Sequence, residues 1–324
     1  MTSLRLAIGP AGFSTPEVLQ PALDALKAVG IYELDTAEVY GNSEANLGAV
    51  GAADQGFLIS TKNPGGWIKG ALKEVVPKTN ASLERLRAKS VDILYVHGPD
   101  RALALDEWVP QVDELHRQGR FARFGISNFS PDEVRALHAY CGARGFVLPT
   151  VYQGNYNAVS RLVDDTLFPV LRELRIAFYA YSPVAGGFLT KTRRALEEGT
   201  GGGRFSESTP AALKIYHGFY VKPSMLQALD RWEELAGLQG VSKAELAYRW
   251  VYYHSAMKAE LGDTVILGAS KVEQIPLTVE GLEKGPLKPE VVKGIDEIWE
   301  LVKGDAIINN YEALNGSAEF LKPT

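Results

Sequence analysis

Several features are scarce in this chain of 324 residues, and each absence excludes a class of protein. The chain has one cysteine, Cys141, so no internal disulfide can form, which fits a reducing compartment. No apolar run approaches the roughly 18 residues that a membrane span needs. The N-terminal segment is interrupted by Gly9, Pro10 and Gly12, and it lacks the apolar core of a signal peptide. The sequence therefore predicts a soluble, cytoplasmic protein.

Positive charge is also in short supply. The chain has 34 Lys and Arg residues against 39 Asp and Glu, a net charge of −5. This balance offers no basic footprint for nucleic acid or an anionic membrane, so neither is expected as a partner. No cluster of His, Cys and acidic residues has the spacing of a metal site, and no metal is expected.

What the chain does contain is the profile of an ordinary globular protein, with 46% hydrophobic and 23% charged residues. At about 150 residues per domain the length would suggest roughly two domains, but single α/β barrels commonly reach this size. We therefore expect one domain over residues 1–324.

Short runs rich in β-branched and aromatic residues alternate with helical patterns along the chain. The strand candidates are Leu4–Ile8, Ile31–Asp35, Phe57–Thr61, Val91–Val96, Ala122–Ile126, Thr150–Gln153, Ile176–Tyr181 and Thr264–Leu267. Helical patterns include Pro16–Val29, Asn80–Lys89, Pro131–Tyr140, Val163–Leu174, Lys243–His254 and Pro289–Val302. This alternation predicts an α/β fold, a (β/α)8 TIM barrel with a parallel sheet covered by helices. A doubly wound sheet is the competing architecture, but no G-x-G-x-x-G follows an early strand.

Two segments depart from the alternation. Residues 191–224, after the seventh strand, contain glycine at 199 and 201–203, two prolines and many polar residues. A long Gly-rich loop of this kind is either a functional lid or a disordered insertion, and its role is left open. The part after Thr278 adds a C-terminal helix and an irregular tail.

Polar side chains follow three consecutive strand candidates. Asp35 ends the second, with Tyr40 five residues further on, while Lys62 follows the third and His97 follows the fourth. Active sites of such barrels lie at the carboxyl ends of the strands, so we expect these four side chains to face one cavity. Each alone is explained as a turn, cap or solvated residue; their joint placement favours a catalytic site.

These four residues suit a specific chemistry. A tyrosine of ordinary pKa, about 10, is a poor acid–base catalyst at neutral pH. An adjacent ammonium such as that of Lys62 lowers this pKa by favouring the phenolate, and the Asp35 carboxylate can hold the ammonium in place. A histidine can donate a hydrogen bond to a substrate oxygen and align it. The set is suited to protonating a carbonyl oxygen while a hydride arrives at the carbon.

The sequence segments around these residues resemble those of a known family. The segments Leu34–Gly41, Ser60–Lys62, Asp92–His97, Gly125–Phe129, Tyr152–Gln153 and Ala180–Gly187 are similar to those of the aldo-keto reductase superfamily. The resemblance runs in family order from the first strand to about Tyr311. The segments Arg249–Trp250, Tyr253–Ser255 and Val265–Gly268 look most similar to the aflatoxin-aldehyde reductase branch.

The resemblance implies NADPH-dependent reduction of an aldehyde or ketone to an alcohol. Tyr40 would be the general acid, Lys62 and Asp35 its tuning pair, and His97 the group that orients the carbonyl. The implied nicotinamide and pyrophosphate contacts are Ser127, Asn128, Gln153, Tyr181, Ser182, Pro183, Val184 and Gly186. Asn and Gln side chains offer the paired donors and acceptors that a carboxamide needs, and an aromatic face suits a flat ring. Without the family, Ser127-Asn128 reads as a turn.

The adenine end of the implied cofactor site departs from the family pattern. Gly268, Ser270, Lys271 and Gln274 match the segment that binds the 2′-phosphate, where a helix N-terminus favours an anion. Many family members carry Arg where Gln274 stands, and losing that donor weakens the NADP preference. NADPH is favoured and NADH stays open. Arg204 either compensates from the Gly-rich segment or is a solvated loop residue.

The substrate side is less informative. Trp67, Tyr220 and Tyr311 are candidates for an aromatic pocket wall, or they pack in the core or on the surface. Related reductases of acidic semialdehydes use a cationic residue near the C-terminus, and Asn310–Ala313 offers none. The sequence therefore favours a neutral small-molecule carbonyl compound. It does not identify the physiological substrate, the preferred reaction direction or the oligomeric state, and a homodimer is left open.

Two other functions are compatible with the same residues. Lys62 could form a Schiff base in a lyase or aldolase, although a lysine beside a carboxylate is usually charged. The chain could instead be a cofactor-binding regulatory subunit with little turnover, like the aldo-keto-reductase-like β subunits of potassium channels. Catalytic turnover would separate the reductase from both alternatives.

Overall fold

The computed structural model describes residues 3–315 of the chain. Their contacts divide the chain into two compact units. The first, here called the barrel unit, comprises residues up to 154, 167–179 and 258–277. The second, here called the helical unit, comprises residues 155–166, 180–257 and those from 278 onward. The expectation of a single domain over 1–324 stays a prediction.

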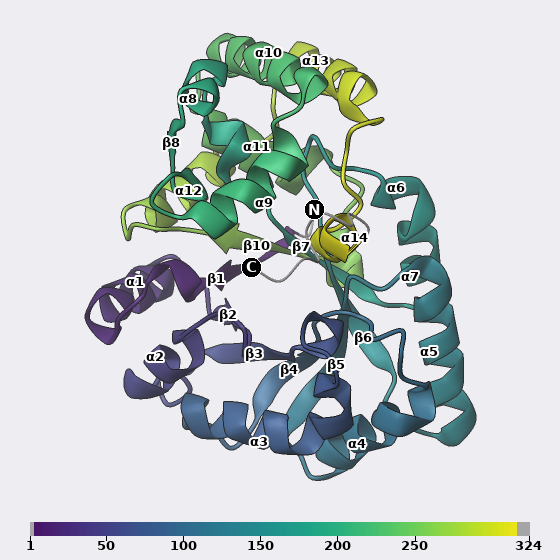
Figure 1. Ribbon diagram of the computed structural model, residues 1–324. Helices are drawn as coiled ribbons and strands as arrows, with labels where there is room; N and C mark the ends of the chain where they lie inside the picture. Colours follow the sequence, from purple (N-terminus) through teal and green to yellow (C-terminus); the bar gives the residue numbers. More distant parts are fainter. Residues whose placement is uncertain (1–2, 316–324) are drawn as a thin grey trace. The chain divides into compact units, whose positions relative to one another are not determined.

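Eight parallel strands close into a barrel, which confirms the predicted fold class (Figure 1). In barrel order they are β1 (Arg5–Gly9), β10 (Thr264–Gly268), β7 (Ala177–Tyr181), β6 (Pro149–Asn155), β5 (Phe121–Ser127), β4 (Val91–Val96), β3 (Leu58–Asn63) and β2 (Glu33–Asp35). All eight predicted strands are present, with ends that differ by a few residues. Their near-continuous apolar runs are explained by burial on both faces, inside the barrel and under the helices.

The helices of the barrel unit lie outside the strands. They are α1 (Pro16–Ala28), α2 (Ser43–Ala49), α3 (Val75–Leu86), α4 (Leu105–Arg117), α5 (Pro131–Arg144) and α7 (Phe168–Glu173). Figure 1 shows α3, α4 and α5 outside β3, β4 and β5. The start of α5 follows from its sequence: Ser130 and Glu133 each accept a hydrogen bond from the other's backbone amide. Helix α3 begins five residues before Asn80, so the predicted start at Asn80 is wrong.

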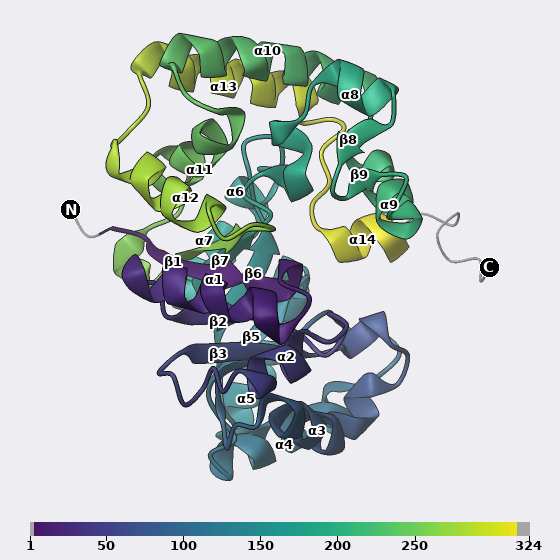
Figure 2. The same ribbon diagram turned by 90° about the vertical axis from the view of Figure 1, so that its left-hand side faces the viewer.

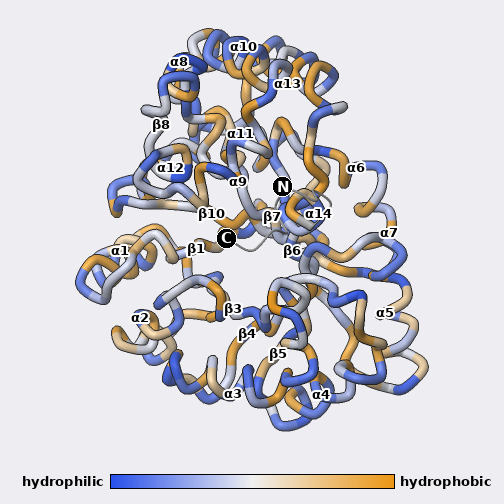
Figure 3. Tube along the Cα trace, viewed as in Figure 1, coloured by the Kyte–Doolittle hydropathy of each residue, from blue (hydrophilic) through white to orange (hydrophobic). Residues whose placement is uncertain are grey.

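The helical unit contains the remaining helices and a small hairpin. They are α6 (Val163–Thr166), α8 (Arg193–Glu197), α9 (Pro210–Tyr220), α10 (Pro223–Gln239), α11 (Lys243–His254), α13 (Pro289–Val302) and α14 (Asn310–Asn315), with β8 (Thr200–Gly202) and β9 (Phe205–Ser206). Helices α10 and α13 lie side by side (Figure 2). Apolar and polar residues are interspersed along both helices, as expected for helices that bury one face (Figure 3). Helix α12 (Gln274–Glu283) begins in the barrel unit and ends in the helical unit.

The Gly-rich segment 191–224 is ordered rather than a plain loop. It forms α8, the antiparallel hairpin β8–β9 and α9, in that order. The glycines provide the hairpin's tight turn, since Gly202 and Gly203 both have positive φ, at 70° and 61°. Among the described residues, no helix is both long enough and apolar enough to cross a membrane.

Candidate active site

The barrel brings the four predicted catalytic residues to one end of its sheet. Asp35 is the last residue of β2, Lys62 lies near the end of β3, and His97 directly follows β4. Tyr40 lies on the turn between β2 and α2, where its backbone amide donates to the Ala37 carbonyl. Because parallel strands end at the same rim, three consecutive strands place all four side chains together.

Lys62 is enclosed completely, with no exposed surface, and it is paired with Asp35. Its Nζ donates to Asp35 Oδ2 at 2.7 Å and to the Thr36 carbonyl at 2.7 Å. Burial lowers the pKa of Lys62, and the Asp35 carboxylate opposes that shift. The other Asp35 oxygen accepts from Gln153 Nε2 at 2.8 Å. The carboxylate is therefore held from both sides and fixes the position of the ammonium.

Tyr40 and His97 face each other above this pair. The Tyr40 hydroxyl lies 3.4 Å from His97 Nε2, and the two rings meet edge to face. Lys62 Nζ lies 5.0 Å from the centre of the Tyr40 ring. Burial and the Lys62 charge lower the pKa of His97 well below its usual range. His97 is therefore neutral at physiological pH and presents one N–H donor.

The backbone around His97 is held by three hydrogen bonds. Its amide donates to the Asn63 carbonyl at 3.0 Å. Its carbonyl accepts from Asn128 Nδ2 at 2.8 Å and from Trp67 Nε1 at 3.1 Å. Trp67, predicted as a pocket wall, is half-buried, and its indole also meets the His97 ring edge on. Trp67 therefore borders the site and helps to fix the histidine.

The turn that carries Trp67 needs a glycine. Gly65 has a φ of +57°, and a Cβ atom there would lie 2.2 Å from the Gly98 carbonyl oxygen. The next residue, Gly66, donates its amide to that same oxygen at 3.0 Å. Because Gly65 has no side chain, the turn after β3 can pack directly against Gly98, the residue after His97.

Ser127, Asn128 and Gln153 lie at the ends of β5 and β6 in the same rim. Asn128 has a φ of +65°, and its Nδ2 also donates to Ser127 Oγ at 3.0 Å. All three side chains are buried. Since Gln153 Nε2 donates to Asp35, the carboxamide contact predicted for Gln153 would use its Oε1. The nicotinamide assignment of these residues stays a prediction.

The predicted 2′-phosphate segment lies beyond the end of β10. Gln274, the first residue of α12, folds its side chain back over Ser270 and Lys271. Its Oε1 accepts from the Ser270 amide at 2.8 Å and from the Lys271 amide at 3.2 Å. Gly268 ends the strand, and a Cβ atom there would meet nothing within 4 Å. Two amides of this segment are therefore already held by a glutamine oxygen.

In the helical unit, residues 181–187 form a turn of unusual backbone geometry. Positive φ values occur at Ser182 (57°), Ala185 (53°), Gly186 (66°) and Gly187 (104°). Asn157 Nδ2 donates to the Ser182 carbonyl at 3.1 Å, and the Tyr181 hydroxyl accepts from the Asn310 amide at 3.3 Å. Non-glycine residues with positive φ are uncommon outside functional sites and special turns, so this turn is a candidate ligand contact.

The sequence left Tyr220 either as a pocket wall or as a packing residue. Only 1% of its surface is exposed, which favours packing in the core. Its ring stacks on Phe188 with centroids 5.3 Å apart, and burial raises the pKa of its hydroxyl. Tyr220 is a core residue of the helical unit. Tyr311, in α14, is also largely buried, with 7% of its surface exposed.

Two positively charged residues lie near the 181–187 turn, Arg204 and Lys191. The sequence analysis named the first as a candidate and did not name the second. Arg204 stacks over Tyr216 at 4.8 Å, and its Nη1 donates to the Tyr216 hydroxyl at 2.5 Å. Tyr216 in turn packs where a Cβ atom of Gly186 would lie. Lys191 was missed by sequence reasoning, although its Cε would lie 3.9 Å from a Gly187 Cβ. The only sequence signal was its position four residues after that glycine.

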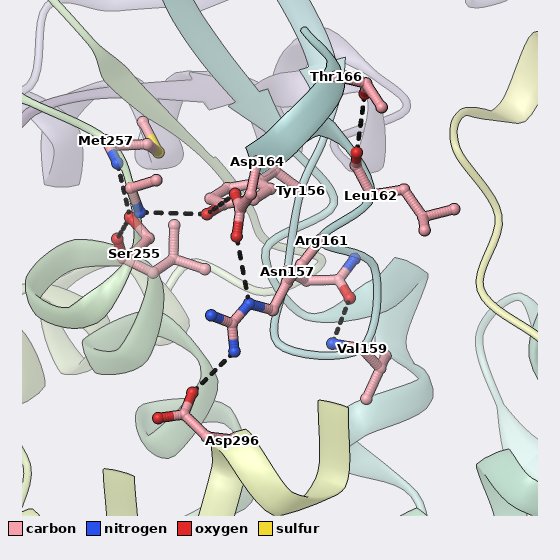
Figure 4. A network of polar contacts seen from close by, with 12 residues as sticks. Tyr156, Asn157, Val159, Arg161, Leu162, Asp164, Thr166, Ser255, Met257 and Asp296 are labelled. Carbon is pink, nitrogen blue, oxygen red and sulfur yellow. Dashed lines mark hydrogen bonds and ion pairs between the residues drawn. The ribbon is translucent and has the colours of Figure 1, made fainter. Parts of the chain in front are cut away.

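A polar network that runs from the buried Tyr156 to the surface supports the segment that contacts this turn (Figure 4). The Tyr156 hydroxyl donates to Asp164 at 2.6 Å and accepts from the Ala256 amide at 3.1 Å. Arg161 pairs with Asp164 and with Asp296 of α13, at 3.4 and 2.8 Å. The Tyr156 amide also donates to the Tyr181 carbonyl. The network therefore anchors residues 155–164 against α13 and the turn.

Comparison with known proteins agrees with the geometry. A sequence model described as the Aldo/keto reductase family matches residues 5–300. The chain belongs to the aldo/keto reductase family. This reductase is 41% identical to "Oxidoreductase sirO" of Leptosphaeria maculans, over 88% of this chain and 86% of the relative. It is 37% identical to "Aflatoxin B1 aldehyde reductase member 4" of Homo sapiens (84% of this chain, 86% of the relative). It is also 37% identical to "Aflatoxin B1 aldehyde reductase member 2" of Rattus norvegicus (84% and 77%).

These matches confirm the predicted superfamily and its aflatoxin-aldehyde-reductase-like branch. They also confirm the predicted class of enzyme, an NAD(P)H-dependent oxidoreductase. Within residues 3–315 there is no group of three or more His, Cys, Asp or Glu side chains that could hold a metal ion.

Proposed function

We propose that this chain reduces an aldehyde or ketone to an alcohol with NADPH, and that Tyr40 is the general acid. The observation that carries the proposal is the 3.4 Å approach of the Tyr40 hydroxyl to His97 Nε2 above the Lys62–Asp35 pair. A carbonyl oxygen placed between these two groups would contact a phenol that can donate a proton and an imidazole that can orient it.

Each residue has a defined task in this proposal. The cofactor supplies the hydride to the carbonyl carbon, and Tyr40 passes its hydroxyl proton to the oxygen. The buried Lys62 ammonium then stabilises the tyrosinate that remains, because opposite charges attract strongly in a water-poor site. Asp35 keeps Lys62 in position, and neutral His97 aligns the oxygen without competing as an acid.

The residues present fit a nicotinamide cofactor. Near the four predicted catalytic residues, Ser127, Asn128 and Gln153 supply buried hydroxyl and amide groups that could bind a carboxamide. In the helical unit, Tyr181 would supply the stacking surface. In the turn 182–187 the amides of Ala185 and Gly187 already donate to the Ser182 and Val184 carbonyls, so the amides of Val184 and Gly186 would be the ones to contact the pyrophosphate. Lys191 and Arg204 would add positive charge beside it.

In the predicted 2′-phosphate segment, Lys271 is the cation on which a preference for NADPH over NADH would rest. Gln274 has no charge to offer a 2′-phosphate, and its oxygen accepts from the Ser270 and Lys271 amides. We therefore propose NADPH as the preferred cofactor, with a selectivity narrower than an arginine at position 274 would give.

The substrate that fits best is uncharged. Val39 and Ile68, beside Tyr40 and Trp67, are exposed hydrophobic residues, with 39% and 44% of their surface accessible. They would border the substrate with apolar surface. The nearby Glu38 carboxylate is paired with Lys78, so it offers no free charge. The relatives named for aflatoxin B1 aldehyde are consistent with an aldehyde of this kind.

The test mixes purified protein with 4-nitrobenzaldehyde and NADPH and follows the loss of reduced-nicotinamide absorbance, with NADH in parallel. We expect oxidation of NADPH that is abolished in Tyr40→Phe, while that variant still binds NADPH by fluorescence titration. Activity retained in Tyr40→Phe would contradict the assignment of the acid. NADPH binding without turnover of a broad aldehyde panel would support the regulatory alternative instead.

A further inference from the structure

Three adjacent strands place Lys62, Tyr95 and Gly125 in one row across the barrel. In the β3–β4 pairing Lys62 is the partner of Tyr95, and in the β4–β5 pairing Tyr95 is the partner of Gly125. Residues at the same register in neighbouring parallel strands point to the same face. Tyr95 also lies two residues before His97, which puts both on the interior face.

Gly125 gives the Tyr95 ring its place. A Cβ atom at position 125 would lie 2.3 Å from Tyr95 Cδ1 and 2.5 Å from Cε1, far inside contact distance. Gly125 has an ordinary extended backbone, so its φ does not explain why glycine stands there. Glycine at position 125 therefore leaves the space that the Tyr95 ring occupies against β5.

The ring that occupies this space lies beside the Lys62 ammonium. Lys62 Nζ is 5.6 Å from the centre of the Tyr95 ring and 5.0 Å from that of Tyr40. Tyr95 and Lys62 are both completely buried. Two aromatic rings thus contribute negative quadrupole faces to an ammonium whose remaining partners are Asp35 and the Thr36 carbonyl.

The Tyr95 hydroxyl is an uncharged group beside Gln153. It is buried and makes no hydrogen bond of standard geometry to the described residues. Burial, followed by the charge of Asp35, raises its pKa well above the usual range, so the group stays an uncharged phenol. The feature of Tyr95 that acts on Lys62 is its ring.

We propose that Tyr95 is a positioning residue that holds the Lys62 ammonium in its charged form beneath Tyr40, and that Gly125 is required because it makes room for the Tyr95 ring. The proposal rests on the proposed reductase function for its kinetic consequences only. The protonation state of Lys62, with which the proposal is mainly concerned, can be measured without turnover.

The direct test measures the protonation of Lys62 by NMR of protein labelled with ¹⁵N at lysine Nζ. The signal of Lys62 is assigned by its loss in Lys62→Met. In Tyr95→Leu and Tyr95→Met, the deprotonation midpoint should fall by roughly half a unit to one and a half pH units, the equivalent of a lost buried cation–π contact. Tyr95→Phe, which keeps the ring, should leave the midpoint within about 0.3 units of the wild-type value.

The glycine supplies a second, independent test. Gly125→Ala should lower the Lys62 midpoint as Tyr95→Leu does, because the added methyl group displaces the ring. Gly154→Ala is the control for crowding: its Cβ would lie 2.6 Å from the Phe178 ring, so the added methyl group meets a different ring. Gly154→Ala should lower the melting temperature and leave the Lys62 midpoint unchanged.

Kinetics provide the third readout. Because the proposed role of Lys62 requires its charge, Tyr95→Leu should lower kcat and move the alkaline limb of the kcat profile to lower pH, in parallel with the Lys62 midpoint. The KM for NADPH should stay within about twofold.

Three results would overturn the proposal. The first is a wild-type Lys62 midpoint in both Tyr95→Leu and Tyr95→Met, with only the melting temperature lowered. The second is a shift in Tyr95→Phe as large as in Tyr95→Leu, which would assign the effect to the hydroxyl. The third is a shift in Gly154→Ala equal to that in Gly125→Ala. An inactive wild-type protein would contradict the proposed function and leave the NMR test intact.

Discussion

Gln274 Oε1 accepts hydrogen bonds from the backbone amides of Ser270 and Lys271, at 2.8 and 3.2 Å. The backbone amides just before α12 therefore have a hydrogen-bond acceptor, and it is a neutral side chain of the same segment. An incoming 2′-phosphate would have to displace this oxygen to reach the amides, and it would gain no charge from residue 274. This relationship leads to the first prediction.

Replacing Gln274 with Arg should raise the preference for NADPH over NADH by about tenfold or more, because a guanidinium binds phosphate through paired hydrogen bonds. The measurement is the dissociation constant of each cofactor by quenching of tryptophan fluorescence. Gln274→Glu is the matched control, since it keeps an oxygen acceptor and adds negative charge, and it should lower NADPH affinity only. An unchanged ratio in both variants would place the 2′-phosphate elsewhere.

The second prediction concerns His97 and the pH dependence of stability. Burial and the Lys62 charge lower its pKa in the folded state, while in the unfolded chain the pKa is about 6.5. Below that pH the unfolded state binds a proton that the folded state does not, so stability falls as the pH decreases. The slope from this one group approaches about 1.4 kcal/mol per pH unit.

The check compares urea unfolding of wild-type protein and His97→Gln between pH 5 and pH 8. The wild-type free energy of unfolding should fall more steeply below about pH 6.5 than that of the variant, which has no imidazole to titrate. Parallel curves would mean that His97 titrates normally in the folded protein.

The third prediction tests the Tyr156 network of Figure 4. Tyr156→Phe removes the hydroxyl that joins Asp164 to the Ala256 amide, which leaves both groups without that partner. The expected loss is about 1–3 kcal/mol in the free energy of unfolding, measured in urea. Thr166→Val is a control at the same segment, since its hydroxyl bonds only the Leu162 carbonyl at an exposed position. A loss in Tyr156→Phe no larger than in Thr166→Val would show that the network is not stabilising.

The sequence was sufficient to predict the barrel and the placement of Asp35, Tyr40, Lys62 and His97 at one rim, because both depend on local patterns. Each strand is a short apolar run, and Asp35, Lys62 and His97 lie at strand ends, where topology alone brings them together. Lys62 stands beside Asp35 because β2 and β3 are neighbours, which chain order already implies.

The parts that the sequence did not predict depend on contacts between distant segments. Asn80 looked like a helix start because Asn caps helices well, but packing of the apolar residues before it extends α3 to Val75. The sequence left Tyr220 open between a pocket wall and a packing residue, and only the three-dimensional contacts with Phe188 show that it is enclosed. Gly125 gave no sign that its missing side chain makes room for Tyr95.

The last prediction concerns the turn at Gly186. A Cβ atom there would lie 2.1 Å from Tyr216 Cε1, and the backbone φ is +66°, so Gly186→Ala combines a clash with backbone strain. Gly202 has a similar φ of +70°, but a Cβ atom there would meet nothing within 4 Å. Gly202→Ala therefore carries only the strain, about 1–2 kcal/mol.

Both variants should lose stability, but only Gly186→Ala should lose cofactor affinity, by about tenfold or more, because the displaced turn no longer presents its amides to the pyrophosphate. Fluorescence titration with NADPH and thermal unfolding separate the two effects. Equal NADPH affinity in the two variants would show that the 182–187 turn does not contact the cofactor. A loss confined to Gly186→Ala would tie the positive-φ geometry of this turn to nucleotide binding, since the matched strain at Gly202 leaves binding intact.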